Sequence, residues 1–585
     1  MHVLERINWM MKNRAGWGKY SQILLMIAGA CVIFVFYARY ALHINTVWEL
    51  PDEYGYIANA AYLSGTEWSP LSNMYYGWGY SLLLLPFFLI GSKGTALIRG
   101  AILVNALCTV ATYWIQIGLI SRLCKKINKY IVVLMAFVLS FYPYIMASNV
   151  KVLSEPLLTL MIWLCGLVLC KALETKHVGW YALLALCMAY TFFVHTRSFV
   201  FIGTWMLVLV LMDILKKVNW KHLLIVFVLF AVFYVMGYEV KNMLITDVYS
   251  NVVGTDASQG TTTVANVIGI GAIIGKIKAL FTGQISIYLC SIICKYFYLA
   301  VATVGTYQLG VYAVTKDCLA KWRQRIPFSV EEWIKLSFVL ASLLMICATT
   351  MNSPGRLNAV AFFFYGRYYE YLVLPVVVFG LEYFVSSKLG WKTHLIHTAV
   401  VIVSGVVVYM MHQLIESQVV TIDIFRMSSF SGLTLEGIDY RRMVVCYLSV
   451  TVLSILIGAA LNHKESVRWM FLVVVLAGFA FNNKEIDKLV ISFSEAALPD
   501  NAIVEYVLEN VDEEQVYYLD GQYVSYTTRM QVLLGMKQLV VLGIEDLEQA
   551  SENYLLVQTS SRYSEELSEF EKVMSGYYYD LYYID

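Results

Sequence analysis

The sequence predicts an all-α polytopic membrane protein of about 13 transmembrane helices, followed by a small C-terminal α/β domain on the extracytoplasmic side. First, 59% of its 585 residues are hydrophobic and 14% are charged, with a mean hydropathy of +0.65. This composition excludes an ordinary soluble protein. Second, apolar runs of about 17–25 residues, the length of a helix that crosses a bilayer, recur along the chain. Third, the runs stop before residue 498, where shorter helix and strand patterns replace them.

The predicted spans follow the apolar runs in order. The first run comes after a basic N-terminal segment and has no small-residue cleavage site, so we expect an uncleaved span rather than a signal peptide. An additional run at 78–90 holds only about a dozen apolar residues and includes Pro86, so we expect a re-entrant or interfacial helix there. The spans are expected at 22–42, 97–120, 131–148, 156–172, 180–196, 199–215, 222–239, 287–314, 335–351, 371–386, 395–414, 443–461 and 469–482.

The positive-inside rule orients these spans. When 78–90 is left out of the count, most basic clusters fall on one side, which is then cytoplasmic together with the N-terminus. Counting 78–90 as a span would move every later basic loop outside. We therefore expect a multi-pass protein of the cell membrane with an extracytoplasmic C-terminal domain. The cytoplasmic loops would be 122–129, 173–177, 216–222, 316–325, 387–394 and 462–468.

The two predicted domains, 1–497 and 498–585, differ in charge. From residue 500 onward there are 17 acidic and 4 basic residues, a net charge of −13, so the preceding residues carry +14. The segments IVEYVLENV and YTTRMQVLLG are typical of helices, and QVYYLD, KQLVVLG and NYLLVQ are typical of strands. This small domain has no glycine-rich phosphate loop and no nucleophile elbow, which favours a docking or support role over a second active site.

A long external loop is expected over 249–286. Its Gly/Thr/Ser-rich stretch is either a simple connection or a lid over a substrate. None of the eleven cysteines lies in the C-terminal domain, and their positions indicate neither a disulfide framework nor a metal cluster.

The dipeptide Asp52-Glu53 is the strongest functional signal in the sequence. It opens the segment 52–64, just after the first span. Adjacent carboxylates repel each other and gain nothing from lipid. A carboxylate at the bilayer surface can deprotonate an acceptor beside a lipid-linked donor. Asp52 can also simply cap the helix that follows it, and the dipeptide alone leaves both interpretations open.

Further polar residues are expected on the same side of the membrane, where charges are costly unless they are paired or functional. Each has a structural alternative. Glu155 can pair with Lys151 along a helix turn, and His195 can be an ordinary interior histidine. Arg197 and Arg367 can simply anchor the chain at the headgroups. The set comprises Lys151, Glu155, His195, Arg197, Arg367 and Tyr368.

This pattern resembles the GT-C superfamily of polyprenyl-phosphate-dependent glycosyltransferases. The closest subgroup contains the aminoarabinose transferases and the protein O-mannosyltransferases and is similar to glycosyltransferase family 39. The resemblance covers about residues 1–385, and the rest matches in layout only. One departure is Ser-Glu at 154–155, where the subgroup commonly has Pro-Glu. The matching features are Asp52-Glu53, the run YYGWGYSLLLLPFFLIG followed by Arg99, Ser154-Glu155, and Arg367-Tyr368 ahead of Pro375.

The resemblance implies a GT-C-like catalytic module over 1–497, with juxtamembrane helices in the first external loop, 43–96. It would transfer a sugar from a polyprenyl-phosphate donor by one inverting displacement, with Asp52 as general base. Glu53 and Glu155 would hold acceptor or sugar hydroxyls. The donor phosphate would be bound by Arg367 and Tyr368, with Arg197 and Lys151 as further candidates.

The same resemblance implies the partners. They are membrane lipid, a polyprenyl-phosphate-linked sugar, and a glycan, lipid or protein acceptor, with no nucleic acid. No cofactor is expected beyond the donor. The first external loop has no DxD motif, so we expect no catalytic metal.

Two other functions stay open from the sequence. A transporter or flippase of lipid-linked glycans would place charges at the middle of spans and interrupted helices in two matching halves. Here the charges gather at the external ends, and the sequence has no visible internal repeat. A polysaccharide ligase or polymerase would rely on later loops, through Arg356, Arg426 and His412, more than on Asp52.

Overall fold

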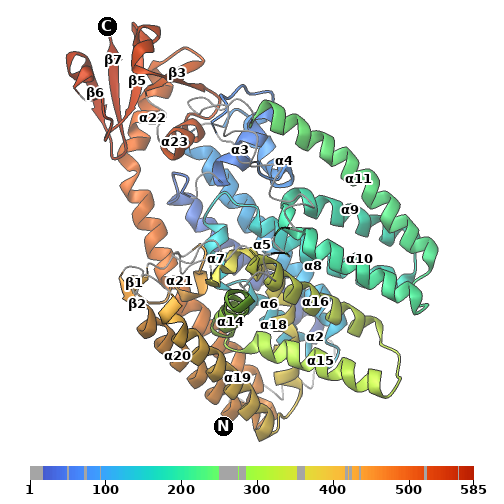
Figure 1. The fold of residues 1–585 in the computed structure, drawn as a ribbon. Helices are drawn as coiled ribbons and strands as arrows, with labels where there is room; N and C mark the ends of the chain where they lie inside the picture. The colour runs from blue at the N-terminus through green and yellow to red at the C-terminus, as the bar shows by residue number, and fades with distance from the viewer. Residues whose placement is uncertain are drawn as a thin grey trace.

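A helical bundle carries a small mixed α/β domain at one end (Figure 1). We call that end of the bundle the domain side and the opposite end the far side. The computed structural model describes residues 17–48, 52–71, 75–92, 94–249, 275, 278, 285–351, 363–414, 419–420, 425–433, 437–519, 524–563 and 565–585.

Each predicted apolar run coincides with a helix or a pair of helices, and the chain is a multi-pass membrane protein. The short 3₁₀ helices are η1 (Arg39–Leu42), η2 (Thr196–Ser198), η3 (Gly366–Tyr368), η4 (Glu370–Leu372), η5 (Met411–Leu414), η6 (Ser428–Phe430) and η7 (Glu465–Met470). The bundle helices are α2 (Trp17–Ala38), α5 (Thr95–Leu123), α6 (Lys129–Leu139), α7 (Pro143–Asn149), α8 (Glu155–Thr175), α9 (Val178–Val194), α10 (Phe199–Ile214), α11 (Trp220–Asp247), α14 (Ile285–Ala302), α15 (Thr306–Arg323), α16 (Val330–Thr350), α18 (Val373–Ser386), α19 (Trp391–Met410), α20 (Tyr440–Asn462) and α21 (Phe471–Ala496).

Among the described residues, ten helices are long and apolar enough to cross a membrane, or eleven if α6 and α7 form one bent span. These two helices meet at an angle of 53°. Pro143 begins α7, and a proline cannot continue the hydrogen-bond ladder of a preceding helix. The predicted run 131–148 is therefore two helices. Two further predicted spans correspond to the shorter helices α9, of 17 residues, and α18, of 14 residues.

The single span predicted over 287–314 is wrong, because the chain breaks there into α14 and α15. Val304 has φ of 52° and Gly305 has φ of 76°, which are left-handed values that end a right-handed helix. A Cβ atom on Gly305 would lie 2.8 Å from Nε2 of His397. The left-handed backbone of Gly305 and the adjacent ring of His397 therefore both exclude a side chain at residue 305. A hydropathy window does not detect this constraint.

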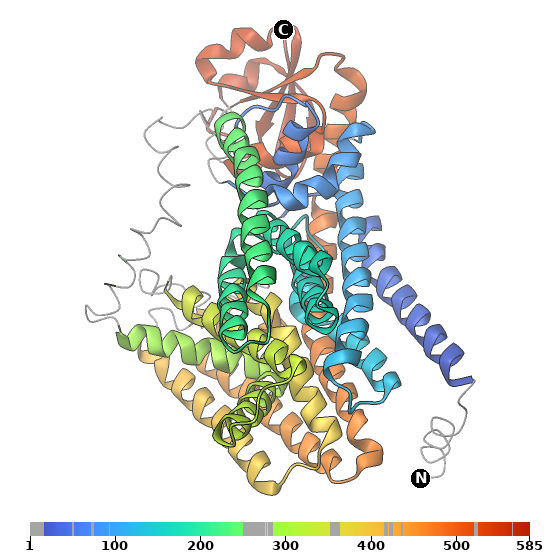
Figure 2. The same cartoon turned by 90° about the vertical axis from the view of Figure 1, so that its right-hand side faces the viewer.

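The first loop folds against the domain side of the bundle. It contains α3 (Asp52–Leu63) and α4 (Trp78–Leu89), which lie next to the C-terminal domain (Figures 1 and 2). The 12 residues of α4 make a helix of only about 18 Å, against a bilayer core of about 30 Å. This length fits the prediction that 78–90 does not cross.

The C-terminal domain is a five-stranded mixed sheet with helices. The strand order is β4-β3-β5-β7-β6, with β3 parallel to β4 and β5, and with β7 antiparallel to β5 and β6. Its elements are α22 (Leu498–Asn510), β3 (Gln515–Leu519), α23 (Val524–Leu534), β4 (Gln538–Leu542), η8 (Ile544–Ala550), β5 (Asn553–Gln558), η9 (Glu566–Glu569), β6 (Glu571–Ser575) and β7 (Tyr579–Ile584). A separate small pair, β1 (Val419–Val420) and β2 (Ile438–Asp439), lies in a loop of the bundle.

The predicted fold class, a polytopic helical protein with a small C-terminal α/β domain, is confirmed. The sequence analysis missed β6 and β7, the two antiparallel strands at one edge of the sheet, where β7 pairs with β5 and β6. Three predictions fall outside the described residues: Arg356, nearly all of the loop 249–286, and the N-terminal segment before residue 17.

The orientation in the membrane can be tested by cysteine labelling. Ser560 lies in the C-terminal domain and Asn128 at the far side, and both are exposed. We expect a membrane-impermeant maleimide to label Ser560→Cys on intact cells and to label Asn128→Cys only after permeabilisation. The parent protein without an added cysteine is the control. Labelling of Asn128→Cys but not Ser560→Cys on intact cells would show that the protein has the opposite orientation in the membrane.

Candidate active site

Four charged side chains from distant parts of the chain meet at the domain side. Nη2 of Arg367 lies 2.6 Å from Oδ2 of Asp52, and Nε of Arg367 donates to Oε1 of Glu155 at 2.6 Å. Nη2 of Arg197 reaches the same Glu155 oxygen at 3.3 Å. We call these four residues the Arg367 cluster. Arg367 joins two carboxylates through two different nitrogens, so its planar fork sets their separation.

The cluster is buried unevenly. The side chains of Glu155 and Arg367 are 1% and 5% exposed, whereas that of Asp52 is 24% exposed. Two guanidinium groups face two carboxylates, which offsets the cost of holding charge at this depth. Asp52 is therefore the carboxylate that a substrate can reach.

Asp52 is positioned by the first turn of α3 and by Tyr76. The hydroxyl of Tyr76 donates to Oδ1 of Asp52 at 2.7 Å. This approach requires glycine at residue 55, because a Cβ atom there would lie 2.0 Å from the Tyr76 ring. Asn59, one turn further along α3, donates to the Tyr76 carbonyl at 3.0 Å. The segment YGYIAN thus positions the tyrosine that holds the carboxylate.

Glu155 is held at the first turn of α8. Ser154, just before it, shares a hydrogen bond of 2.7 Å with the hydroxyl of Tyr56 on α3. The second carboxylate oxygen of Glu155, Oε2, is buried and has no hydrogen-bond partner among the described residues. A buried acceptor without a donor is costly. Among the described residues, Oε2 is therefore an acceptor that the fold leaves unsatisfied.

Arg197 braces the segment that carries Arg367. Its Nη1 donates to the Arg367 carbonyl at 3.1 Å, and its own carbonyl accepts from the hydroxyl of Tyr371 at 3.3 Å. Its guanidinium lies 4.4 Å from the ring centroid of Tyr368. This arrangement ties η2 to η3, so the two arginines are placed together.

Asp52 is ionised at neutral pH in this arrangement. Burial raises its pKa, but the Arg367 charge and the hydrogen bond from Tyr76 lower it by more, so the pKa of Asp52 lies below its usual value. The ion pair with Arg367 thus keeps Asp52 ready to accept a proton but makes it a weak base.

Both carboxylate oxygens of Glu53 accept hydrogen bonds from backbone N–H groups. Its Oε2 accepts from the backbone N–H of Trp48 at 2.5 Å, and its Oε1 accepts from that of Val152 at 2.7 Å. It therefore ties the first loop to the segment between α7 and α8. Neighbouring residues of a helix point about 100° apart, so two adjacent carboxylates cannot face one site together.

Lys151 also lies elsewhere than predicted. Its ammonium group packs over the ring of Phe425 and lies 5.6 Å from the ring centroid of Trp48. The alternative of a helix-turn pair with Glu155 fails as well, because α8 begins only at Glu155. Lys151 precedes the helix and so does not share its face.

The other predicted residues support the cluster or lie apart from it. The ring of His195 lies against Arg197, with Nδ1 3.3 Å from the Arg197 backbone N and Nε2 3.0 Å from Nε of Arg197, and a neutral imidazole accepts a hydrogen bond at only one of these two nitrogens. Tyr368 stacks on Tyr365 with ring centroids 4.0 Å apart. Of the residues on which a polysaccharide ligase or polymerase would rely, His412 shares a 3.1 Å hydrogen bond with the Tyr409 carbonyl. The carbonyl of Arg426 accepts from Gly366 at 2.7 Å.

Two solved structures match nearly the whole chain. ArnT from Cupriavidus metallidurans bound to undecaprenyl phosphate matches with a TM-score of 0.52 at 12% identity, over 97% of this chain and 98% of that chain. The same protein in the apo state matches with a TM-score of 0.50 at 13% identity and the same coverage. The chain has a GT-C fold.

A third structure, the apo oligosaccharyltransferase of Archaeoglobus fulgidus, matches with a TM-score of 0.45 at 10% identity, over 93% of this chain and 70% of that chain. No family model and no curated protein matches the sequence. Identities this low establish the GT-C fold alone, so the activity has to be argued from the site.

The GT-C fold also contains a buried acidic residue that the sequence analysis missed. Glu370, in η4, accepts from the hydroxyls of Tyr142 at 2.6 Å and Tyr298 at 3.2 Å. Ser429 donates to it at 3.5 Å. Burial raises the pKa of Glu370 to about 7, although these hydrogen bonds lower it. The run YGRYYEYLVLP contained one signal, an acidic residue at the edge of an apolar span.

Ionisation of Glu370 should destabilise the fold. Its pKa is raised on folding, so its neutral form stabilises the fold fully below the ordinary glutamate pKa, and this stability is lost as the pH rises through about 7. In detergent, the free energy of unfolding of the wild type should fall between pH 5.5 and 8 by about 2 kcal/mol more than that of Glu370→Gln. Glu495→Gln, an exposed carboxamide change, is the control. Equal pH profiles for Glu370→Gln and the wild type would refute this assignment.

Proposed function

We propose that the protein is a glycosyltransferase that moves a sugar from a polyprenyl-phosphate donor to an acceptor at the extracytoplasmic face of the membrane. The Arg367 cluster is the observation that carries this proposal. It places a reachable carboxylate, a buried carboxylate and two guanidinium groups together where the bundle meets the C-terminal domain. The GT-C fold and the positive-inside orientation support the reaction and its side.

Arg367 and Arg197 would bind the donor phosphate. A guanidinium group matches phosphate oxygens through its fixed fork of N–H donors. The leaving group of such a donor is already a phosphate, so the transition state needs cationic stabilisation more than an acid. The Tyr368 ring beneath Arg197 would hold that guanidinium in position for the phosphate.

Asp52 would act as the general base. It takes the proton of an acceptor hydroxyl while the acceptor oxygen bonds to the anomeric carbon. The bond from that carbon to the phosphate oxygen breaks, and its electron pair leaves with the polyprenyl phosphate. One displacement of this kind inverts the anomeric centre. Glu155 would meanwhile accept a hydrogen bond from a substrate hydroxyl at Oε2, the oxygen that has no partner among the described residues.

Donor binding would also strengthen the base. In the empty site Arg367 pairs with Asp52 at 2.6 Å, which keeps the pKa of Asp52 low. A donor phosphate that takes the Nη2 donor of Arg367 draws this charge away from Asp52. The pKa of Asp52 then rises, and Asp52 becomes a stronger base only when the donor is in place.

We propose that this transfer needs no metal. Both carboxylates of the cluster already have guanidinium partners, and these supply the positive charge that a cation would bring. The sugar and the acceptor, whether lipid, wall polymer or protein, are to be identified by mass spectrometry of envelope glycans with and without the protein.

The base assignment predicts that Asp52→Asn lowers the transfer rate about 10²–10⁴-fold. Folding should be preserved, because Arg367 keeps its second carboxylate partner. The measurement is turnover with a short-chain polyprenyl-phosphate sugar in the presence of EDTA, with thermal unfolding as the folding check. Asp247→Asn is the matched control, since Asp247 lies on the same side at the end of α11 and accepts from Tyr62. Near wild-type turnover by Asp52→Asn would remove Asp52 as base, and a requirement for a divalent cation would contradict the metal-free mechanism.

The donor assignment predicts graded losses at Arg367. Arg367→Ala should lose both donor binding and rate, and Arg367→Lys should recover only part of each, because one ammonium cannot reach two partners as Nε and Nη2 do. Turnover measured as a function of donor concentration gives kcat and KM, which report the two effects. Arg39→Lys is the control, since Arg39 also pairs with a carboxylate, that of Asp487, at 2.6 Å, but its side chain is 44% exposed. Full activity of either Arg367 variant would mean that Arg367 is only an interfacial anchor.

A further inference from the structure

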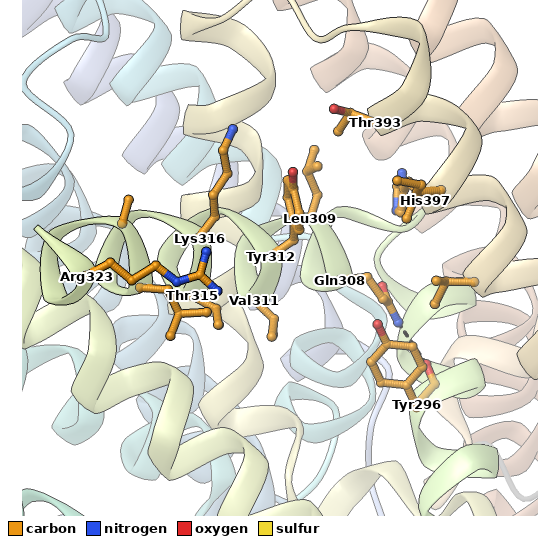
Figure 3. Close-up of a pocket in the computed structure, with 14 residues that line it drawn as sticks. Tyr296, Gln308, Leu309, Val311, Tyr312, Thr315, Lys316, Arg323, Thr393 and His397 are labelled. Carbon is orange, nitrogen blue, oxygen red and sulfur yellow. Dashed lines mark hydrogen bonds between the residues drawn. The ribbon is translucent and has the colours of Figure 1, made fainter.

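A groove of about 560 Å³ lies between α15 and α19, away from the Arg367 cluster (Figure 3). Most of its lining comes from one face of α15 and one face of α19, with a tyrosine from α14 at one end. Four lining residues, Tyr312, Leu319, Ile396 and Val400, are 40% to 58% exposed, so the groove faces outward from the bundle. In a membrane, lipid is the medium on that side.

The packing of the helices creates this groove. α15 packs on α18, where a Cβ atom at Gly310 would lie 2.0 Å from the Val376 carbonyl oxygen. α19 packs instead on α14 and α20. The break at Gly305 turns α15 away from the line of α14, so α15 and α19 diverge beyond it. His397 closes the narrow end by a 2.9 Å hydrogen bond with the Gly305 carbonyl.

The residues of α15 that line the groove differ between its two ends. The narrow end contains Leu309 and Gln308, whose side-chain amide is held by the Tyr296 carbonyl at 2.9 Å. The hydroxyl residues Tyr312 and Thr315 follow. The last turns, at the far side of the bundle, carry Lys316 and Arg323. Both cations of the lining are therefore at the far-side end of α15, with the apolar residues Leu319 and Ala320 between them.

The charge of the groove has one sign. Among the described residues that line it, Lys316 and Arg323 are cationic and none is acidic. Lys316 donates to the hydroxyl of Tyr383 at 3.2 Å, a neutral partner. Asp317, the next residue along α15, lines a different cavity. The cationic end is therefore complementary to an anion.

We propose that this groove binds one anionic phospholipid of the leaflet at the far side. Its phosphate lies between Lys316 and Arg323, its ester oxygens accept from Tyr312 and Thr315, and an acyl chain follows the apolar faces of α15 and α19. From Arg323 to Leu309 the helix rises about 21 Å. One leaflet with its headgroup layer is about 20–22 Å thick, so one lipid spans the groove from end to end. Basic pockets between helices at a cytoplasmic surface bind acidic headgroups in this manner.

The test measures lipid binding and not transfer, so it is independent of the proposed function. Delipidated protein is titrated with phosphatidylglycerol or phosphatidylcholine and analysed by native mass spectrometry. The wild type should bind one phosphatidylglycerol in preference. Lys316→Gln/Arg323→Gln should bind it about 30-fold more weakly, since each cation contributes close to a fivefold preference. Ala320→Trp, which fills the groove and keeps both charges, should also lose binding.

The control is Lys388→Gln/Lys464→Gln. These two exposed lysines lie in the loops before α19 and after α20, and neither lines the groove. The control variant should bind phosphatidylglycerol as the wild type does, and all variants should unfold at wild-type temperatures. The proposal is overturned if phosphatidylcholine binds equally well, or if the groove and control variants weaken binding equally. It is also overturned if the lipid retained from cells in this groove is a polyprenyl phosphate.

Discussion

The two ion pairs of Arg367 organise the domain side of the GT-C fold. One guanidinium group contacts Asp52 from the first loop and Glu155 from the start of α8, each at 2.6 Å. A buried carboxylate without such a partner would be costly, so each contact holds its segment in place. The bridge holds the start of α3, and α3 in turn holds Tyr76 through Asn59.

The two carboxylates of the cluster are not held equally by the arginines. Glu155 is the more buried of the two carboxylates and is bonded by both arginines, whereas Asp52 is partly exposed and is paired with Arg367 alone in the cluster. A phosphate that binds Arg367 as proposed would therefore displace the Asp52 contact at lower cost than the Glu155 contact. Arg367 thus both links the two segments and keeps Asp52 ionised. The proposed donor would displace Asp52, the weaker of its two contacts.

The C-terminal domain supports the first loop from its other end. Nε1 of Trp68 donates to the Gly535 carbonyl at 2.7 Å, and Gln538 contacts Ser69 at 3.3 Å. α3 is therefore fixed at its start by Arg367 and beyond its end by the domain. This agrees with a support role for the domain rather than a second active site, and α23 of the domain lies against α3 (Figure 1).

The sequence alone was sufficient for the membrane helices and for most of the cluster. Each apolar residue lowers the free energy of a helix in the membrane, whichever segments the helix later packs against. Likewise Asp52, Glu155 and Arg367 were recognisable because charge at the end of a span is costly wherever the rest of the chain lies. These are local properties, so a linear pattern contains them.

Only the tertiary structure decided which charges meet. Glu53 and Lys151 have the same sequence signal as their neighbours in the site, yet one binds two backbone amides and the other packs on aromatic rings. Glu370 and the break at Gly305 depend on partners more than 90 residues away, Tyr142 and His397. Pairing of side chains across the bundle is set by contacts between distant segments, and no local pattern specifies it.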